Sequence, residues 1–82
     1  MALNKKWVLW NLREAVEEIN RTIAELETEP DYGEAALCVR LRETYNHLNT
    51  GWNARDVSDE AAQAASDDDF DRWWQMPDDI IY

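Results

Sequence analysis

The stretch Leu37–Arg55, LCVRLRETYNHLNTGWNAR, combines regular apolar spacing with a nearly continuous run of polar side chains. Its apolar residues recur at steps of three and four, which places them on one side of an α-helix. They are Cys38, Leu41, Tyr45, Leu48 and Trp52. This spacing predicts a helix over residues 31–55, with its apolar side as a core face and with Gly51 inside the helix. The single cysteine, Cys38, excludes an internal disulfide, and we expect it to be a small buried hydrophobe.

One edge of this face carries a polar strip, which consists of Arg42, Asn46, Asn49 and Asn53. At about 100° per residue these side chains lie close to one another on the same side of Tyr45. Buried amide groups need partners, because an unpaired one costs about 1–3 kcal/mol. The strip therefore holds the C-terminal segment against the long helices, forms a polar recognition groove beside Trp52, or is simply solvated. The sequence leaves these interpretations open.

A stricter apolar stripe lies earlier in the chain. Its members are Leu9, Leu12, Val16, Ile19, Ile23 and Leu26. This spacing is typical of helices that pack knobs into holes, and with Asn4 as the N-cap it predicts a helix over residues 4–28. Pro30 cannot continue that helix, and Asp31 followed by Glu34 indicates a capping box that starts the next one. We expect two antiparallel helices that meet along their apolar stripes.

Two serines mark short helices in the last third of the chain. Ser58 is placed to cap an alanine-rich helix over residues 58–65. Ser66, with Asp69 three residues on, predicts a second helix over residues 66–75, and the acidic first turn suits the positive end of its dipole.

Residues 76–82 form a tail with an apolar end, Ile80-Ile81-Tyr82, which either docks on the domain or inserts into a partner. No linker or repeat interrupts the chain, so we expect residues 1–82 to form one small helical domain. The predicted fold class is all-α: an antiparallel helical hairpin of two long helices, with two short C-terminal helices packing back across it.

Charge is distributed unevenly along the sequence. The chain has a net charge of −10, of which residues 1–55 contribute −2 and residues 56–82 contribute −8. Such a surface repels nucleic acid and anionic membranes and favours basic protein partners. No apolar run approaches the roughly 20 residues of a membrane span, and acids come too early for a signal peptide. We expect a cytoplasmic protein with no direct nucleic-acid or membrane binding.

The antiparallel hairpin should gather tryptophans at one end of the molecule. Trp7 and Trp10 lie at the start of the first helix, Trp52 near the end of the second, and Trp73 and Trp74 on the last helix. Large aromatic side chains either bury about 150–250 Å² each or mark an interface. These five therefore cover one another, form an exposed patch for a protein partner, or line a small-ligand pocket.

The sequence contains no motif for catalysis, metal binding or a cofactor. His47, the only histidine, falls on the outer side of its helix one turn after Glu43, so we expect a surface ion pair. A general base needs an orienting partner, and a nitrogen or sulfur metal site needs several His or Cys ligands. We therefore expect no enzyme activity, no cofactor and no metal.

The pattern favours a non-catalytic, acidic protein-interaction module that binds another protein or itself. Self-association as a homodimer is the simplest version, with two hairpins forming a four-helix bundle. The candidate binding residues are Arg42, Asn46, Asn49, Trp52, Asn53, Trp7, Trp10, Trp73 and Trp74. The alternative is an acidic mimic of nucleic acid, or inhibitor, that binds a basic protein surface. Its carboxylates would be Asp59, Glu60, Asp67, Asp68, Asp69, Asp71, Asp78 and Asp79.

Overall fold

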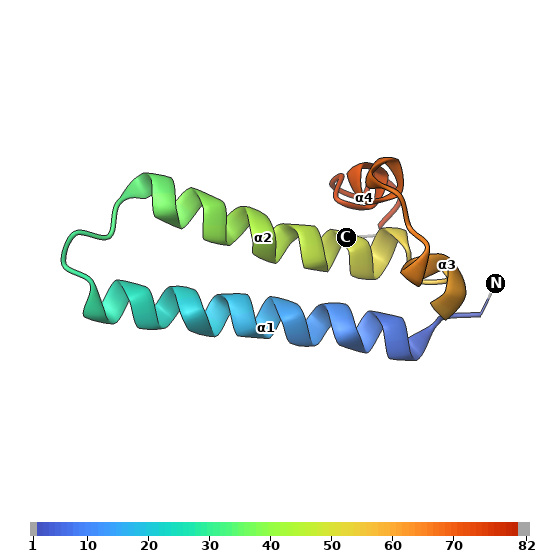
Figure 1. Cartoon of the computed structure of the whole chain (residues 1–82), viewed down its shortest axis with the longest axis horizontal. Coiled ribbons are helices and arrows are strands. Elements are labelled where there is room, and N and C mark those ends of the chain that lie inside the picture. The colour runs from blue at the N-terminus through green and yellow to red at the C-terminus, as the bar shows by residue number, and fades with distance from the viewer. Residues whose placement is uncertain (1, 81–82) are drawn as a thin grey trace.

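The computed structural model describes residues 2–80, and its regular structure over that range is helical throughout (Figure 1). Two long helices, α1 (Lys5–Thr28) and α2 (Glu34–Asn53), lie side by side and run in opposite directions. Two short helices follow, α3 (Asp59–Gln63) and α4 (Asp67–Trp73), and α4 lies against α2. The predicted all-α fold, a helical hairpin with two short C-terminal helices returning to it, is confirmed.

The first helix begins as predicted. The Asn4 side chain is its N-cap and accepts a hydrogen bond from the backbone N–H of Trp7 at 3.2 Å. The second helix continues through Gly51, also as predicted, and ends at Asn53, slightly before the expected residue 55. Both long helices are therefore continuous.

The start of α2 was predicted wrongly. The helix begins at Glu34, not at residue 31, and its N-cap Gly33 has no side chain to contribute a bond, so Asp31 forms no capping box. The physical reason is the tight turn that follows α1. The backbone N–H of Tyr32 donates to the carbonyl of Glu29 at 3.2 Å, so the chain is still turning at Asp31.

Both short helices carry their predicted serine caps. The hydroxyl of Ser58 accepts from the backbone N–H of Ala61 at 3.1 Å. At α4 the bonds are reciprocal: the Ser66 hydroxyl accepts from the Asp69 N–H at 3.2 Å, and the Asp69 carboxylate accepts from the Ser66 N–H at 3.0 Å. Both helices end two residues earlier than predicted.

Small and polar side chains fill the seam between α1 and α2. The buried residues of this seam are Asn11, Ala15, Glu18 and Thr22 of α1 and Thr44 and Gly51 of α2. The threonine hydroxyls donate within their own helices, Thr22 to the Glu18 carbonyl at 2.7 Å and Thr44 to the Arg40 carbonyl at 3.0 Å. These hydroxyls need no partner across the seam, and the two helices meet over short side chains.

The apolar stripes do not form the core, and that prediction is wrong. Nine of their side chains are 42–54% exposed: Leu9, Leu12, Val16, Ile19, Ile23 and Leu26 on α1, and Leu41, Tyr45 and Leu48 on α2. Cys38 is also exposed, against its expected burial. Within residues 2–80 the buried apolar residues are Ala15, Ala54 and Trp73. The seam uses the short side chains instead of the stripes.

Both stripes lie on the same face of the hairpin. In each helix a stripe residue directly follows a seam residue, as in Ala15-Val16 on α1 and Thr44-Tyr45 on α2, and is turned about 100° from the seam. Because α1 and α2 are antiparallel, this same rotation brings both stripes to one side. We call the nine exposed side chains the apolar face.

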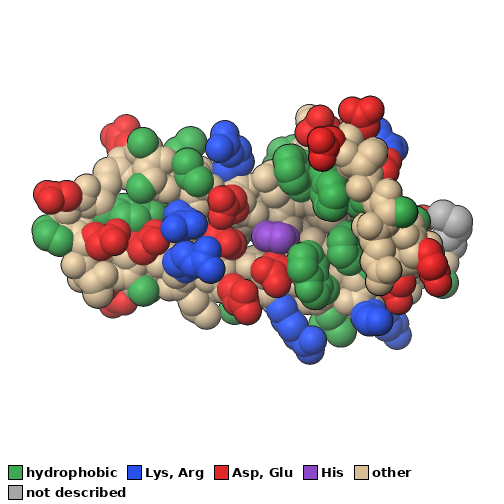
Figure 2. Space-filling view, in the orientation of Figure 1, with side chains coloured by type: hydrophobic (Ala, Val, Ile, Leu, Met, Phe, Trp, Pro, Cys, Tyr) green, Lys and Arg blue, Asp and Glu red, His purple; other side chains and the backbone are tan. Residues whose placement is uncertain are grey.

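Charged side chains occupy the opposite side of the hairpin. Figure 2 shows acidic and basic groups there, around the single histidine. Arg40 of α2 links the helices, because its guanidinium donates to both carboxylate oxygens of Glu25 at 3.0 Å each. Hydrogen bonding to Arg40 holds the pKa of Glu25 below its ordinary value of 4.5. The same guanidinium lies 3.9 Å from the Glu18 carboxylate and 3.7 Å from that of Glu43.

The molecule is elongated and exposes much surface for its mass. It measures 47 × 29 × 22 Å, and its accessible surface is 6193 Å². A compact monomer of 9.7 kDa is expected to expose about 5,100 Å². Among the described residues, no helix has both the length and the apolar character needed to cross a bilayer.

Candidate interaction surface

Two members of the polar strip fasten the end of α4 to α2. The side-chain amide of Asn49 donates to the carbonyl of Trp74 at 2.8 Å. The amide of Asn53 donates to two carbonyls, those of Trp73 at 2.9 Å and Gln75 at 2.7 Å. These contacts match the interpretation in which the strip holds the C-terminal segment.

Replacing Asn53 by alanine should loosen α4. The substitution removes two hydrogen bonds and leaves two carbonyls without a donor, which should weaken the docking of α4 by about 1–3 kcal/mol. Trp73, only 8% exposed, would then meet water. We expect a red-shifted tryptophan emission and faster proteolysis after α3.

Asn46→Ala is the matched control for this prediction, because Asn46 belongs to the same strip and its side chain makes no hydrogen bond with the rest of residues 2–80. It should leave emission and proteolysis unchanged. Equal effects from both variants would show that the amide of Asn53 does not hold α4.

The other two members of the strip, Arg42 and Asn46, border a groove. This groove has a volume of about 680 Å³ and runs between α2 and the segment after α4. Its apolar lining includes Leu41 and Tyr45 of the apolar face together with Trp74 and Met76. Trp74 is 42% and Met76 is 64% exposed, so apolar surface continues from the hairpin onto this segment.

Four of the five tryptophans gather with Phe70 at the end of the hairpin where α1 begins. The rings of Trp7 and Trp10 are stacked, with centroids 5.6 Å apart, and Trp73 meets Trp7 edge-on at 6.3 Å. Phe70 contacts both Trp73 and Trp74, with centroids 5.4 and 5.9 Å away. Trp7 and Trp73 are covered in this way, whereas Trp10 remains 50% exposed.

Trp52 lies outside these ring contacts. Its indole N–H donates to the Asp79 carboxylate at 2.9 Å, and the Arg55 guanidinium lies over its ring at 4.0 Å. The tail is thus tied to α2 through Asp79. Ile80 is half-buried, while Ile81 and Tyr82, the rest of the predicted apolar end, fall outside the described residues.

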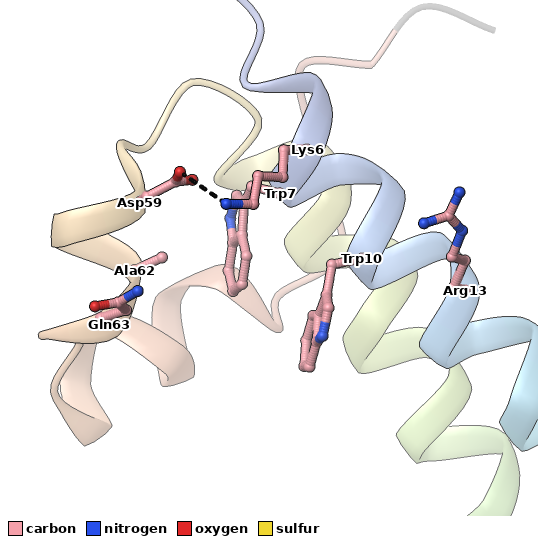
Figure 3. A pocket seen from close by; sticks show the side chains of 7 residues that line it. All are labelled: Lys6, Trp7, Trp10, Arg13, Asp59, Ala62 and Gln63. Atoms are coloured by element: carbon pink, nitrogen blue, oxygen red, sulfur yellow. Dashed lines mark ion pairs between the residues drawn. The ribbon is translucent and has the colours of Figure 1, made fainter.

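A cavity of about 350 Å³ opens beside the stacked indoles (Figure 3). Trp7 and Trp10 form one wall, Ala62 and Gln63 of α3 lie opposite, and the Lys6 ammonium points toward Asp59 at 3.5 Å. The Asn4 amide also donates to Asp59, and this bond, with the nearby Lys6, lowers the pKa of that carboxyl. Two of the five tryptophans thus line a cavity between the start of α1 and α3, and its use as a small-ligand pocket stays a prediction.

His47 does not occupy the outer position predicted for it, and the prediction that it forms a surface ion pair with Glu43 is also wrong. The ring is half-buried against α1, with its Nδ1 3.4 Å from the side-chain oxygen of Asn11, and it forms a T-shaped contact with the ring of Trp10, with centroids 5.9 Å apart. Asn11 is 1% exposed and also donates to the Trp7 carbonyl at 3.1 Å. His47 therefore belongs to the contact between the helices.

Part of the acidic segment is engaged within the chain. Asp59 bonds Asn4, Asp69 forms the capping box of α4, and Asp79 bonds Trp52. Bonds from Ser66 lower the pKa of Asp69. Three of the eight carboxylates proposed for a nucleic-acid mimic thus have internal partners, and that alternative remains a prediction.

The nine side chains of the apolar face remain 42–54% exposed in the folded chain. The sequence marks this face through the three- and four-residue spacing of the two stripes. The same spacing predicts a core, so it does not distinguish a core from an exposed face. Comparisons with protein-family models, with curated proteins and with solved structures found no match.

Proposed function

We propose that this protein is a non-catalytic protein-interaction module that binds through the apolar face of its hairpin. The observation that carries the proposal is the exposure of 42–54% at nine large apolar side chains on one side of two helices. At roughly 90 Å² per side chain the face presents about 800 Å², more than the few hundred Å² in a typical patch on a monomer. Removing it from water would contribute roughly 20 kcal/mol before the costs of association.

A charge placed on the apolar face should abolish partner binding. We expect Val16→Lys to reduce the recovery of binding proteins at least about 10-fold in affinity capture, because an ammonium cannot be buried in an apolar interface without a partner. The bait would be the full chain, with a tagged copy of the same chain added to the source extract, so that self-binding is scored as well.

Val39→Lys is the matched control. Val39 is on α2 and, like Val16 on α1, is exposed, at 41% against 54%, but it lies near Glu25 and Arg40, away from the apolar face. Its capture should equal that of the wild type and persist in about 0.5 M salt, where charge attraction is screened. Capture that collapses with salt and ignores Val16→Lys would favour the acidic mimic instead.

A further inference from the structure

We infer that the apolar face is covered by a second copy of this chain, in a two-fold symmetric four-helix bundle whose hairpins point in opposite directions. This inference rests on the proposed function and names the partner. Four observations carry it: the size of the face, its pattern, the position of the acidic segment, and the charges along its rim.

The size of the face matches one half of a stable dimer interface. Its roughly 800 Å² is about what each partner contributes to an interface of standard size. The accessible surface of 6193 Å², about 1,000 Å² above that expected for a compact monomer of this mass, agrees with a chain that is half of a larger core.

The pattern of the face is self-complementary. It is a layer of two antiparallel helices with apolar side chains at steps of three and four, the spacing used by helices in bundles. A symmetric dimer requires one patch to pair with its own copy. Two such layers face to face form the apolar core of a four-helix bundle without any further segment.

The acidic segment decides the direction of the second copy. Residues 56–82 carry a net charge of −8, and their helices α3 and α4 lie at the end of the hairpin where α1 begins (Figure 1). Hairpins pointing in the same direction would bring two such segments together. Opposite directions place them at the two ends of a bundle about as long as the 47 Å monomer, several times the Debye length of about 8 Å.

The charges along the rim favour the same arrangement. Arg13 and Glu27 are exposed on α1, fourteen residues apart on nearly the same side, and Ile19 lies about midway between them. When the hairpins point in opposite directions, α1 packs antiparallel against α1 of the second copy, and each Arg13 approaches the partner's Glu27. With the hairpins in the same direction, Glu27 would instead lie near the partner's Glu34, and like charges would meet.

Sedimentation equilibrium over a wide concentration range tests the second copy. The wild type and Val39→Lys should sediment at twice 9.7 kDa, and Val16→Lys should dimerise at least about 100-fold more weakly. Val16 is 54% exposed in the single chain, so the lysine leaves the seam intact, and circular dichroism should show unchanged helix content at high concentration. A wild type that stays monomeric up to about 1 mM overturns the inference.

Two outcomes separate this inference from the proposed function. A monomeric wild type that still captures another protein, sensitive to Val16→Lys, overturns the dimer and leaves the interaction module standing. A monomeric wild type whose capture ignores Val16→Lys overturns both.

Spin labels at a single engineered cysteine test the direction. We would use Gln63→Cys in α3, with Cys38→Ser to remove the native thiol. The Lys6–Asp59 contact places α3 level with the start of α1. That position is about 20 Å along the helix axis from Ile19, which lies near the centre of the proposed dimer. Opposed hairpins should therefore separate the labels by about 40 Å. A distribution centred well below this would overturn the opposed arrangement.

Discussion

Replacing Asn4 by alanine is expected to lower the free energy of unfolding by about 2–4 kcal/mol, a large share of the stability of a domain this small. The Asn4 side chain makes three hydrogen bonds. Its oxygen caps α1 by accepting from Trp7, and its amide donates to the Val57 carbonyl at 2.7 Å and to the Asp59 carboxylate at 3.0 Å. Alanine would remove the cap and the link to α3 together.

A serine at the same position separates these two contributions. Asn4→Ser keeps an acceptor for the Trp7 N–H but cannot reach both acceptors beyond α2, so it should recover only about 1 kcal/mol of the loss. Urea unfolding followed by circular dichroism, at one fixed protein concentration, would measure all three proteins. Full recovery by serine would show that Asn4 acts only as a cap and contributes nothing through Val57 and Asp59.

The sequence determines which side of each long helix is apolar but not what covers that side. Ile19 and Tyr45 fall on regular apolar stripes. The spacing of such a stripe is the same whether the stripe packs against the other helix of the hairpin or against a second molecule. The actual seam runs through Ala15, Thr22 and Thr44, whose short side chains give a weak periodic signal. Helices and serine caps could be predicted because they depend on local chemistry, whereas the pairing of faces depends on tertiary contacts.

The same limit applies to the candidate site. Helical spacing predicts that the polar strip lies on one edge of α2, yet only the folded chain shows that Asn49 and Asn53 bond the end of α4 while Arg42 and Asn46 border a groove. His47 was placed from helical phase relative to Tyr45. Because the stripe is not the seam, that phase predicted the wrong surroundings for the ring.

The second large effect concerns Arg40, the cation shared by three carboxylates. We expect Arg40→Leu to destabilise the hairpin at pH 7 at least about twice as much as Arg21→Leu. The Arg40 side chain is 27% exposed and bridges α2 to Glu18 and Glu25 of α1. Arg21, at 50% exposure, pairs only with Glu18 on its own helix, among the pairs within residues 2–80, and such exposed pairs contribute little.

Among the described residues, removing Arg40 would leave the nearly buried Glu18 carboxylate with Arg21 alone, which pairs with its Oε1 at 3.2 Å. Glu18 is 9% exposed, and its Oε2 accepts no hydrogen bond within residues 2–80 but lies 3.9 Å from the Arg40 guanidinium. Leucine would retain much of the apolar stem of Arg40 while removing its charge. The comparison therefore isolates the electrostatic contribution across the seam.

The pH dependence of this difference gives a sharper test. Arg40 lowers the pKa of Glu25 in the folded chain, so the stabilisation is complete above the ordinary value of 4.5 and is lost as the pH falls through the lower folded value. The lowered pKa values of Asp59 and Asp69 act equally in both proteins and cancel in the difference. The gap in unfolding free energy between wild type and Arg40→Leu should therefore be constant from pH 7 to about pH 5 and shrink toward pH 3. A gap that stays constant into acid would mean that Arg40 does not stabilise the seam through the Glu25 carboxylate.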